Sequence, residues 1–269
     1  MSDAASKAAA SAPTSAPSPA QSVSVRVQGL RKSYAGAPVL NGIDFEVNPG
    51  EIFAIMGPSG SGKTVLLKHI IGLEPPDEGD IFIDGESINT PGVMDKHRLA
   101  LVFQSGALLN SLNVLENVGL YLTEHRLKSP QEIVQIATEK LEFLGLKNVK
   151  DRLPSELSGG MKKRVAIARA LVIEPQLILY DEPTSELDPL NAVIIGEEIF
   201  GLKQRIQVTS IVVTHDRDLA FGIADRIAVM HEGLILAIGS PDEIKRHQHP
   251  IIHRFLNADF RPNHTKPKP

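Results

Sequence analysis

Alternating apolar and polar residues mark the first segment that is expected to fold. Residues 22–28 read SVSVRVQ, with valine at every second position, which is typical of a half-buried strand. Another strand is predicted at 43–47, because that run ends at the turn-forming sequence Asn48-Pro49-Gly50. Residues 80–90 are expected to form a hairpin around Asp84-Gly85. These patterns predict β structure near the start of the chain.

Farther along, apolar runs alternate with helical patterns. Residues 51–56 are nearly all apolar, and 64–71 follow as a predicted helix. From about 110 to 175 the pattern is mostly helical, which predicts an inserted helical subdomain over about 105–175. Strands alternating with helices favour an α/β fold with a largely parallel sheet. Strands typical of a buried position are predicted at 177–180, 211–213 and 227–230.

Composition narrows the functional classes. The chain has 269 residues, with 28 Lys and Arg against 32 Asp and Glu, so its net charge is 28 − 32 = −4. A mildly acidic chain does not indicate nucleic-acid binding. It contains no cysteine, which excludes disulfides and thiolate metal sites. No apolar run approaches the roughly 20 residues that span a bilayer, so any membrane role is expected to depend on partners.

The two ends differ from the rest of the chain. Residues 1–22 are rich in Ala, Ser and Pro, and they are predicted to be a disordered tail because they offer too little apolar surface to fold. They show no signal-peptide pattern. Residues 258–269 are predicted to be a C-terminal tail. A single domain is therefore expected over 23–257, and Ser240-Pro241 followed by Glu243 predicts one of its last helix starts.

A glycine-rich loop, MGPSGSGKT (56–64), joins an apolar run to a predicted helix. Its pattern of Gly, four residues, Gly-Lys-Thr is that of a P-loop. The glycines let backbone N–H groups converge on an anion, and the helix start points its positive end at the same place. A flexible Gly/Ser turn is the alternative. We predict that ATP is bound by Gly57, Pro58, Ser59, Gly60, Ser61, Gly62, Lys63 and Thr64.

Two acids end a later apolar strand, LILYDE (177–182). Thr64 and Asp181 are expected to hold Mg²⁺, and Lys63 to reach the β- and γ-phosphates. Glu182 is the candidate general base toward water. Acids are also common where strands simply meet solvent, so this interpretation depends on the P-loop upstream.

A second possible anion site lies at LSGGM (157–161). Ser158 is a natural N-cap, and Gly159 and Gly160 expose backbone amides at a helix start. An ordinary capped helix is the alternative.

Taken together, these motifs resemble those of ATP-binding cassette (ABC) transporter ATPases, over about residues 23–257. The resemblance implies a P-loop NTPase fold with a small antiparallel β region beside the main sheet and the helical subdomain. It implies ATP and Mg²⁺ as cofactors. It also implies a head-to-tail homodimer, in which each ATP lies between the P-loop of one copy and the LSGG helix of the other. In chain order the motifs are Tyr34, GPSGSGKT (57–64), Gln104, LSGGM (157–161), LILYDE (177–182), SELD (185–188) and His215.

The resemblance also implies roles for single residues. Tyr34 is assigned to adenine stacking, and Gln104 to the neighbourhood of Mg²⁺ and the attacking water. His215 is assigned to the γ-phosphate, and Asp188 to the opposite P-loop. Without the resemblance, Tyr34 is a surface aromatic and Gln104 an ordinary polar residue at a strand end. Likewise, His215 is incidental and Asp188 is a helix N-cap.

Two stretches narrow the resemblance further, residues 103–109 and 154–164. They resemble the ATPase of Mla/MCE-type phospholipid transport systems, above all in Met161 and the basic residues after it. This implies an integral-membrane permease and an MCE-domain lipid-carrying protein as partners, no nucleic acid, and a peripheral place on the cytoplasmic face of the inner membrane. Residues 105–120 are expected to expose apolar side chains to the permease.

Three rival functions stay open. The first is an ABC importer ATPase for a polar solute such as an amino acid or ion. The second is a soluble ABC protein that acts on nucleic acid or the ribosome, and the third is a module that holds ATP without hydrolysing it. Glu186 departs from the family pattern, which has a small residue there; an added carboxylate near the dimer axis weakens closure unless it pairs with a lysine or points to solvent.

Overall fold

The protein, examined as a computed structural model, is described over residues 22–257. The predicted tails, 1–22 and 258–269, lie outside the described residues except for Ser22. The strands are β1 (Val25–Tyr34), β2 (Ala37–Val47), β3 (Ile52–Met56), β4 (Glu78–Ile83), β5 (Glu86–Ser87), β6 (Leu99–Val102), β7 (Leu177–Asp181), β8 (Thr209–Thr214), β9 (Arg226–His231) and β10 (Leu234–Gly239). The helices are α1 (Lys63–Ile70), α2 (Val93–Lys96), α3 (Val114–Glu124), α4 (Pro130–Phe143), α5 (Gly159–Leu171), α6 (Pro189–Ile206), α7 (Arg217–Ile223), α8 (Pro241–Lys245) and α9 (Pro250–Leu256), with a 3₁₀ turn at Pro154–Glu156.

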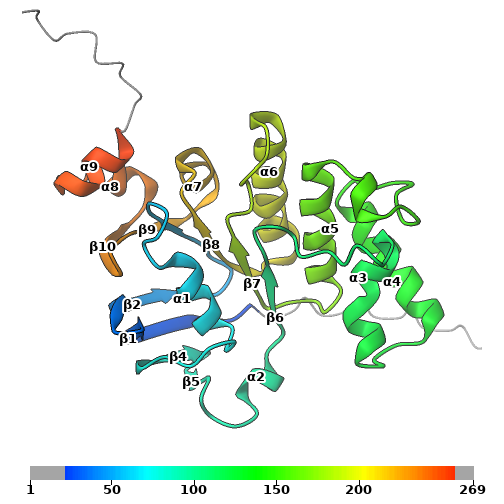
Figure 1. Ribbon diagram of the computed structural model, residues 1–269, viewed down its shortest axis with the longest axis horizontal. Coiled ribbons are helices and arrows are strands. Elements are labelled where there is room, and N and C mark those ends of the chain that lie inside the picture. Colours follow the sequence, from blue (N-terminus) through cyan, green and yellow to red (C-terminus); the bar gives the residue numbers. More distant parts are fainter. Residues whose placement is uncertain (1–21, 258–269) are drawn as a thin grey trace, which may run out of the picture.

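A six-stranded sheet in the order β10-β9-β3-β8-β7-β6 forms the centre of the molecule (Figure 1). Strands β9, β3, β8, β7 and β6 are parallel, and β10 pairs antiparallel with β9. Met56 is in register with Thr214, and Asp181 with Val213. The carboxyl ends of β3, β7 and β8 therefore lie side by side, which is where α/β sheets place their ligands.

A smaller antiparallel sheet in the order β2-β1-β4-β5 lies beside the central one. Helix α1 fills the space between the two sheets with Leu66, Leu67 and Ile70, all of them buried. Phe53 and Ile55 of β3 face this core, while Ile52 faces the core on the other side of the sheet. The period of two along β3 thus directs its side chains into both cores, as expected for a strand buried on both faces.

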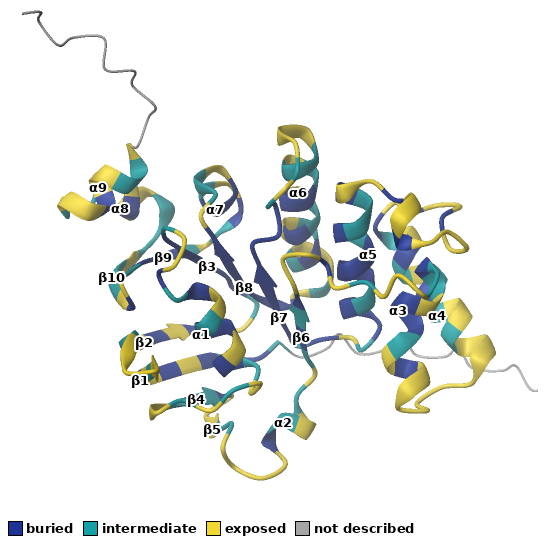
Figure 2. Cartoon of the chain, viewed as in Figure 1, coloured by how far each residue is buried: buried dark blue, intermediate teal, exposed yellow. Residues whose placement is uncertain are grey.

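Helices α3, α4 and α5 form a lobe at one end of the molecule, and α6 and α7 cover the central sheet (Figure 1). The dark central strands and the yellow outer helix faces in Figure 2 show how the apolar residues are concentrated inside. Helices α3 and α4 begin with capping boxes formed by Asn113 with Glu116 and by Ser129 with Glu132. Within residues 22–257, no helix is long and apolar enough to span a bilayer.

Local predictions of turns and caps agree with the structure. Phe82 pairs with Ser87 across a tight turn in which Asp84 and Gly85 both have positive φ, as a hairpin of this kind requires. Ser240 caps α8 in a capping box with Glu243. The predicted strand at 43–47 was too short, because β2 begins at Ala37. Bulges in the β1–β2 ladder let the strand include Asn41 and Gly42.

Candidate functional site

The P-loop (57–64) connects the end of β3 to the start of α1. At Gly57 a Cβ would lie 2.1 Å from the carbonyl oxygen of Met230, so no other residue fits without moving backbone. At Gly62 the φ angle is +102°, and a Cβ would lie 2.9 Å from the carbonyl oxygen of Val39. Both positions thus need glycine for space, and the second needs it for backbone conformation as well.

Lys63 lies at the first position of α1 with its ammonium folded back over the loop. Its Nζ donates to the carbonyl oxygens of Gly57 at 2.9 Å and Pro58 at 3.1 Å. It also lies 3.4 Å from Oε1 of Glu182. Lys63 is only 6% exposed. The loop therefore holds one buried cation above an anion-sized space.

Thr64 and Asp181 meet beside this cation. The Thr64 hydroxyl donates to Oδ1 of Asp181 at 2.9 Å. Burial raises the pKa of the Asp181 carboxyl above its ordinary value, and the hydrogen bond from Thr64 acts in the opposite direction. Hydroxyl and carboxylate oxygens are the ligands that Mg²⁺ prefers. The Ser61 Oγ nearby is buried and has no hydrogen-bond partner among the described residues, so the loop has polar capacity left for a ligand.

Glu182 directly follows β7, and its carboxylate is held from both sides. Oε2 accepts a hydrogen bond from the backbone N–H of His215 at 3.1 Å and lies 2.8 Å from Nδ1 of the same residue. Oε1 faces Lys63. His215 follows β8, the neighbour of β7 in the sheet. Parallel pairing therefore explains why two residues 33 positions apart in sequence are in contact.

These groups surround a pocket of about 390 Å³. Gln104, which follows β6, reaches the same pocket from the edge of the sheet. Val39 and Val65 also line it, and sequence reasoning missed both. Val65 continues the P-loop helix, but nothing in the pattern around Val39 indicates that β2 passes over the loop. The pocket is lined by Val39, Ser59, Gly60, Gly62, Lys63, Thr64, Val65, Gln104, Glu182 and His215.

Tyr34 is not among the pocket residues. It ends β1, is 40% exposed, and donates its hydroxyl to Oε1 of Glu74 at 2.7 Å. Burial of the hydroxyl and this bond to Glu74 raise the pKa of Tyr34 to about 12. The Nζ of Lys32 lies 5.5 Å from the centre of the ring. The structure therefore shows a Tyr34 held by its neighbours, and adenine stacking stays a prediction.

The LSGG residues form the start of α5, away from the pocket. The Ser158 side chain caps the helix by accepting a hydrogen bond from the backbone N–H of Met161 at 3.3 Å. A Cβ on Gly160 would lie 2.5 Å from Oδ1 of Asn191, so this helix start packs tightly on the start of α6. A single chain does not bring Ser158, Gly159 and Gly160 to its own P-loop pocket.

Asp188 lies at the same junction and is the N-cap of α6. Its carboxylate accepts hydrogen bonds from the backbone N–H of Asn191 at 3.0 Å and from its side-chain amide at 2.5 Å. These bonds lower the pKa of the Asp188 carboxyl. The capping role is thus present in the structure, and the contact to an opposite P-loop stays a prediction.

Comparisons with known proteins agree with this geometry. A family model described as ABC transporter matches residues 40–185, more than half of the chain. The probable ribonucleotide transport ATP-binding protein mkl of Mycobacterium leprae is 35% identical over 88% of this chain and 69% of that protein. The chloroplastic protein TRIGALACTOSYLDIACYLGLYCEROL 3 of Arabidopsis thaliana is 38% identical, over 88% and 74%. The sulfate/thiosulfate import ATP-binding protein CysA of Rhodopseudomonas palustris is 40% identical, over 88% and 69%.

Solved structures give the same result. A dimeric ATP-binding cassette in a post-hydrolysis state, bound to ADP and phosphate, is 33% identical with a TM-score of 0.73, over 81% of this chain and 98% of that one. A nucleotide-free cassette from an ABC transporter is 29% identical with a TM-score of 0.77, over 88% and 100%. Such cassettes form dimers, work with membrane permeases and are peripheral to the membrane. The chain therefore belongs to the ABC transporter family, as an ATPase subunit that binds ATP with Mg²⁺ and hydrolyses it.

Proposed function

We propose that this ATPase energises phospholipid transport through a permease and an MCE-domain lipid-carrying protein, at the cytoplasmic face of the inner membrane. The observation that carries the proposal is the resemblance of residues 103–109 and 154–164 to Mla/MCE-type ATPases, in which Met161 is followed by basic residues. Met161 alone is weak support, because it is partly buried and packs against the core. The name of the Arabidopsis relative, which is that of a glycerolipid, also favours a lipid.

Transport of a polar solute is the second candidate. It is favoured by the 40% identity to an ATPase whose name specifies sulfate and thiosulfate import. The mycobacterial relatives carry a third description, ribonucleotide transport. Because these named substrates differ while the ATPase is shared, we propose that the membrane partners select the substrate.

For hydrolysis, we propose roles that follow from the contacts in the pocket. Lys63 releases Glu182 and binds the β- and γ-phosphates, which leaves the Glu182 carboxylate free to take a proton from water. His215 orients that carboxylate and lies beside the γ-phosphate. Thr64, Asp181 and Gln104 hold Mg²⁺, which neutralises phosphate charge when bound.

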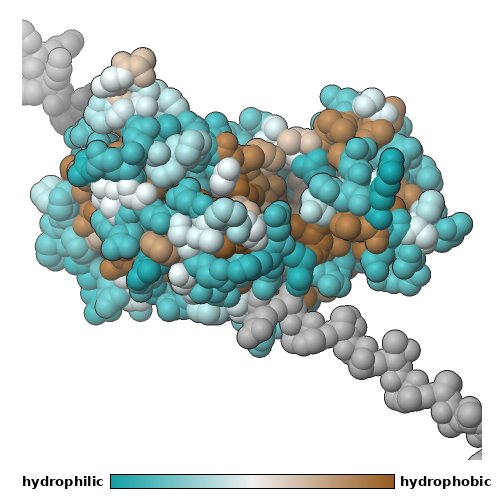
Figure 3. Space-filling model, turned by 90° about the horizontal axis from the view of Figure 1, so that it is seen from below, coloured by the Kyte–Doolittle hydropathy of each residue, from teal (hydrophilic) through white to brown (hydrophobic). Residues whose placement is uncertain are grey.

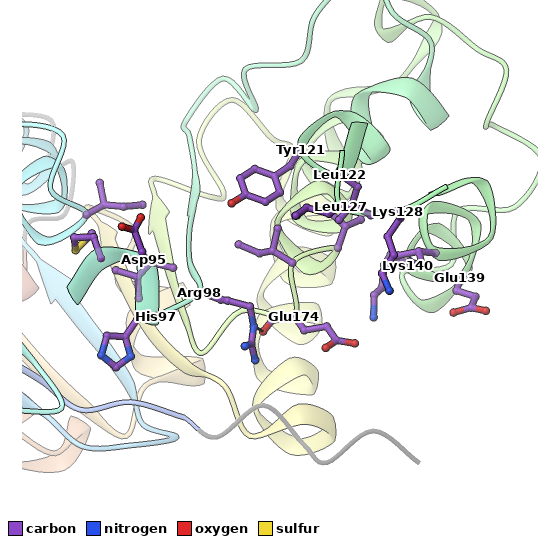
Figure 4. Close-up of a pocket in the computed structure, with 16 residues that line it drawn as sticks. Asp95, His97, Arg98, Tyr121, Leu122, Leu127, Lys128, Glu139, Lys140 and Glu174 are labelled. Carbon is purple, nitrogen blue, oxygen red and sulfur yellow. Dashed lines mark hydrogen bonds between the residues drawn. The ribbon is translucent and has the colours of Figure 1, made fainter. Parts of the chain in front are cut away.

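A groove between the helical lobe (α3, α4 and α5) and the rest of the molecule is the proposed docking place for a cytoplasmic segment of the permease. It encloses about 670 Å³ between α2, α3, α4 and the chain after α5. In Figure 4, Tyr121, Leu122 and Leu127 lie on one side and Asp95 and His97 on the other. Apolar surface also gathers beside the depression between the lobes in Figure 3. The apolar wall suits a partner helix, and the charged rim gives it orientation.

The expected apolar surface over residues 105–120 was only partly correct. Leu109 is 45% exposed, but Val114 and Val118 are fully buried because they form the inward face of α3. Two further exposed apolar residues lie just beyond this segment, Tyr121 at 44% and Leu127 at 54%. The proposed permease contact therefore moves from that segment to the groove.

Purification of the tagged full-length protein from its native membrane in mild detergent tests the lipid proposal. Mass spectrometry of the bound proteins and lipids should find a polytopic permease, an MCE-domain protein and phospholipid together. A solute-binding protein in place of the MCE protein would support the polar-solute candidate instead. Because the chain lacks cysteine, Leu127→Cys gives a single cross-linking site that should capture the permease, whereas a cysteine at Leu234, exposed on β10, should not.

A further inference from the structure

Lys163 is a buried lysine on the second turn of α5 that no proposed step uses. It is 6% exposed. Its Nζ donates to the backbone carbonyl oxygen of Gln104, to Oγ of Ser185 at 3.3 Å and to the carbonyl oxygen of Glu182 at 3.4 Å. An ammonium has three N–H donors and no acceptor, so these three oxygens match its full capacity.

This lysine is buried without a direct carboxylate partner. The ion pairs found among residues 22–257 do not include it. Burial lowers the pKa of Lys163, while the charges of Glu186, Asp181 and Glu182 oppose that shift. Burying a cation costs free energy unless its hydrogen bonds are made. A residue that served only for packing would not need a buried ammonium group at this position.

The three acceptors belong to segments that the chain brings together from far apart. Gln104 follows β6, Glu182 follows β7, and Ser185 lies in the turn before α6. Glu182 has a φ of +46°, a left-handed conformation that a residue with a side chain adopts at a cost. Its carbonyl oxygen also accepts hydrogen bonds from Oγ of Ser185 at 2.8 Å and from the Ser185 N–H at 3.1 Å. These donors hold the backbone turn that points the Glu182 side chain into the pocket.

The helix that carries Lys163 begins at the LSGG residues. Ser158 caps α5, and Lys163 follows five residues later, roughly 7.5 Å along the helix axis. In the head-to-tail dimer of this family, the start of α5 faces the nucleotide of the partner copy. Through Lys163, the same helix also contacts residues that surround the nucleotide site of its own chain.

We propose that Lys163 is a positioning residue for hydrolysis, which ties Gln104 and the backbone of Glu182 to the LSGG helix. When α5 moves onto the nucleotide of the partner copy, Lys163 carries Gln104 and Glu182 with it. The inference rests on the site roles proposed above for these two residues. It assigns Lys163 no contact with nucleotide, so nucleotide affinity is expected to stay with the P-loop.

Steady-state ATPase kinetics of the full-length protein test this role. Lys163→Met keeps an unbranched side chain that is one atom shorter and removes every donor. We expect kcat to fall by about tenfold or more, since small misplacements of reacting groups have effects of that order. The KM for ATP should change less than about threefold, because Lys163 is proposed to act on the chemical step and not on ATP binding. Lys163→Gln restores an amide donor and should recover part of the loss. Lys162→Met, the same change at the preceding position, should keep wild-type kcat.

Ser185→Ala completes the test, because it removes one acceptor and leaves the lysine in place. If Lys163 and Ser185 act on the same turn, the effects on kcat of Lys163→Met and Ser185→Ala will be less than additive in the double variant. Ser185→Ala also keeps the proposal testable if Lys163→Met fails to fold, because Ser185→Ala alone is expected to lower kcat and leave KM unchanged.

Two outcomes overturn the proposal. A kcat of Lys163→Met within about twofold of wild type, with a folded protein, removes the positioning role. The second outcome is a fall in kcat that occurs only together with a lowered melting temperature, without partial recovery of kcat in Lys163→Gln. Lys163 would then be a purely structural residue. Failure of the underlying site is distinguished by Glu182→Gln: if that variant keeps full turnover, the assignment of the base itself is wrong.

Discussion

At the scale of single residues, the pocket is organised around one carboxylate that has two partners. Glu182 contacts Lys63 through one oxygen and His215 through the other. A phosphate group is a stronger partner for Lys63 than a carboxylate that is shared with a histidine. Nucleotide binding is therefore expected to change the partner of Lys63, and we expect Glu182 to be available for its proposed role as the base only after that exchange.

Glu182→Gln tests this view directly. The amide has the same shape and still accepts the hydrogen bond from the His215 N–H, but it cannot take a proton from water. We expect ATP binding to persist while kcat falls by about 10²–10⁴-fold, the usual contribution of a general base. Full turnover in this variant, measured beside ATP affinity from isothermal titration, would count against Glu182 as the base.

The buried Asp181 makes a prediction about pH and stability. Because burial raises its pKa in the folded state, ionisation costs the folded protein more than the unfolded chain. That cost is present at neutral pH and fades as pH falls through the raised pKa toward 3.8. Without nucleotide and with a chelator present, Asp181→Asn should therefore melt at a higher temperature than wild type at pH 7.

The advantage of Asp181→Asn should shrink as the pH falls through the raised pKa of Asp181 toward 3.8, because the folded carboxyl then becomes protonated and its burial no longer carries a charge. Hydrolysis should be lost across this whole range, because the amide is a poor Mg²⁺ ligand. A melting temperature below that of wild type at pH 7, by calorimetry, would show that the Thr64 contact outweighs the cost of burial.

Residues that belong to a local sequence motif could be predicted from the sequence. Residues that act through contacts between distant segments could not. The pattern of glycines and Lys63 depends on local backbone, so the loop could be identified from its own sequence. The contacts of Lys163 join segments 59 and 19 positions away, and no local pattern contains that information. Similarly, the hydrogen bond from the Tyr34 hydroxyl to Glu74 depends on how the antiparallel sheet lies against the chain after α1.

At the scale of elements, the starts of α5 and α6 meet in a close contact, where a Cβ on Gly160 would lie 2.5 Å from Oδ1 of Asn191. Gly160 leaves room for the Asn191 side chain, which in turn is held by Asp188. Both helices therefore start from one small cluster, whereas the sequence predicted Ser158 as a helix cap and gave the capping role of Asp188 only as an alternative to its contact with the opposite P-loop. Propensity and capping patterns identified each helix start, but not their packing against each other.

Gly160→Ala tests this junction. The added methyl forces Asn191 away from Asp188, and overpacking of this kind costs about 1–3 kcal/mol. Asn191→Ala removes the obstacle, so the double variant Gly160→Ala/Asn191→Ala should lose less stability than the sum of the two single changes. Urea denaturation of the nucleotide-free protein measures all three. Strict additivity would mean that the helix starts do not share this contact.

At the scale of the whole molecule, the two regions that are proposed to share one ATP do not meet within a single chain. The P-loop pocket gathers at the carboxyl ends of β3, β7 and β8, whereas the capped start of α5 lies on the junction with α6. The α/β class and the alternation of strands and helices could be read from periodicity, because each element follows its own pattern. How these two regions combine could not, since it depends on a second copy and came from family resemblance.

A dimer assay therefore gives the sharpest test of the assembled molecule. In the Glu182→Gln background, ATP should persist unhydrolysed and convert monomer to dimer, which light scattering after size exclusion detects. Adding Ser158→Arg places a bulky side chain at the start of α5, where the partner's nucleotide is expected. The P-loop of each chain is untouched, so ATP affinity should stay within about threefold while the dimer is lost. A dimer that survives Ser158→Arg would contradict the shared site, because the start of α5 would then lie outside the interface that ATP closes.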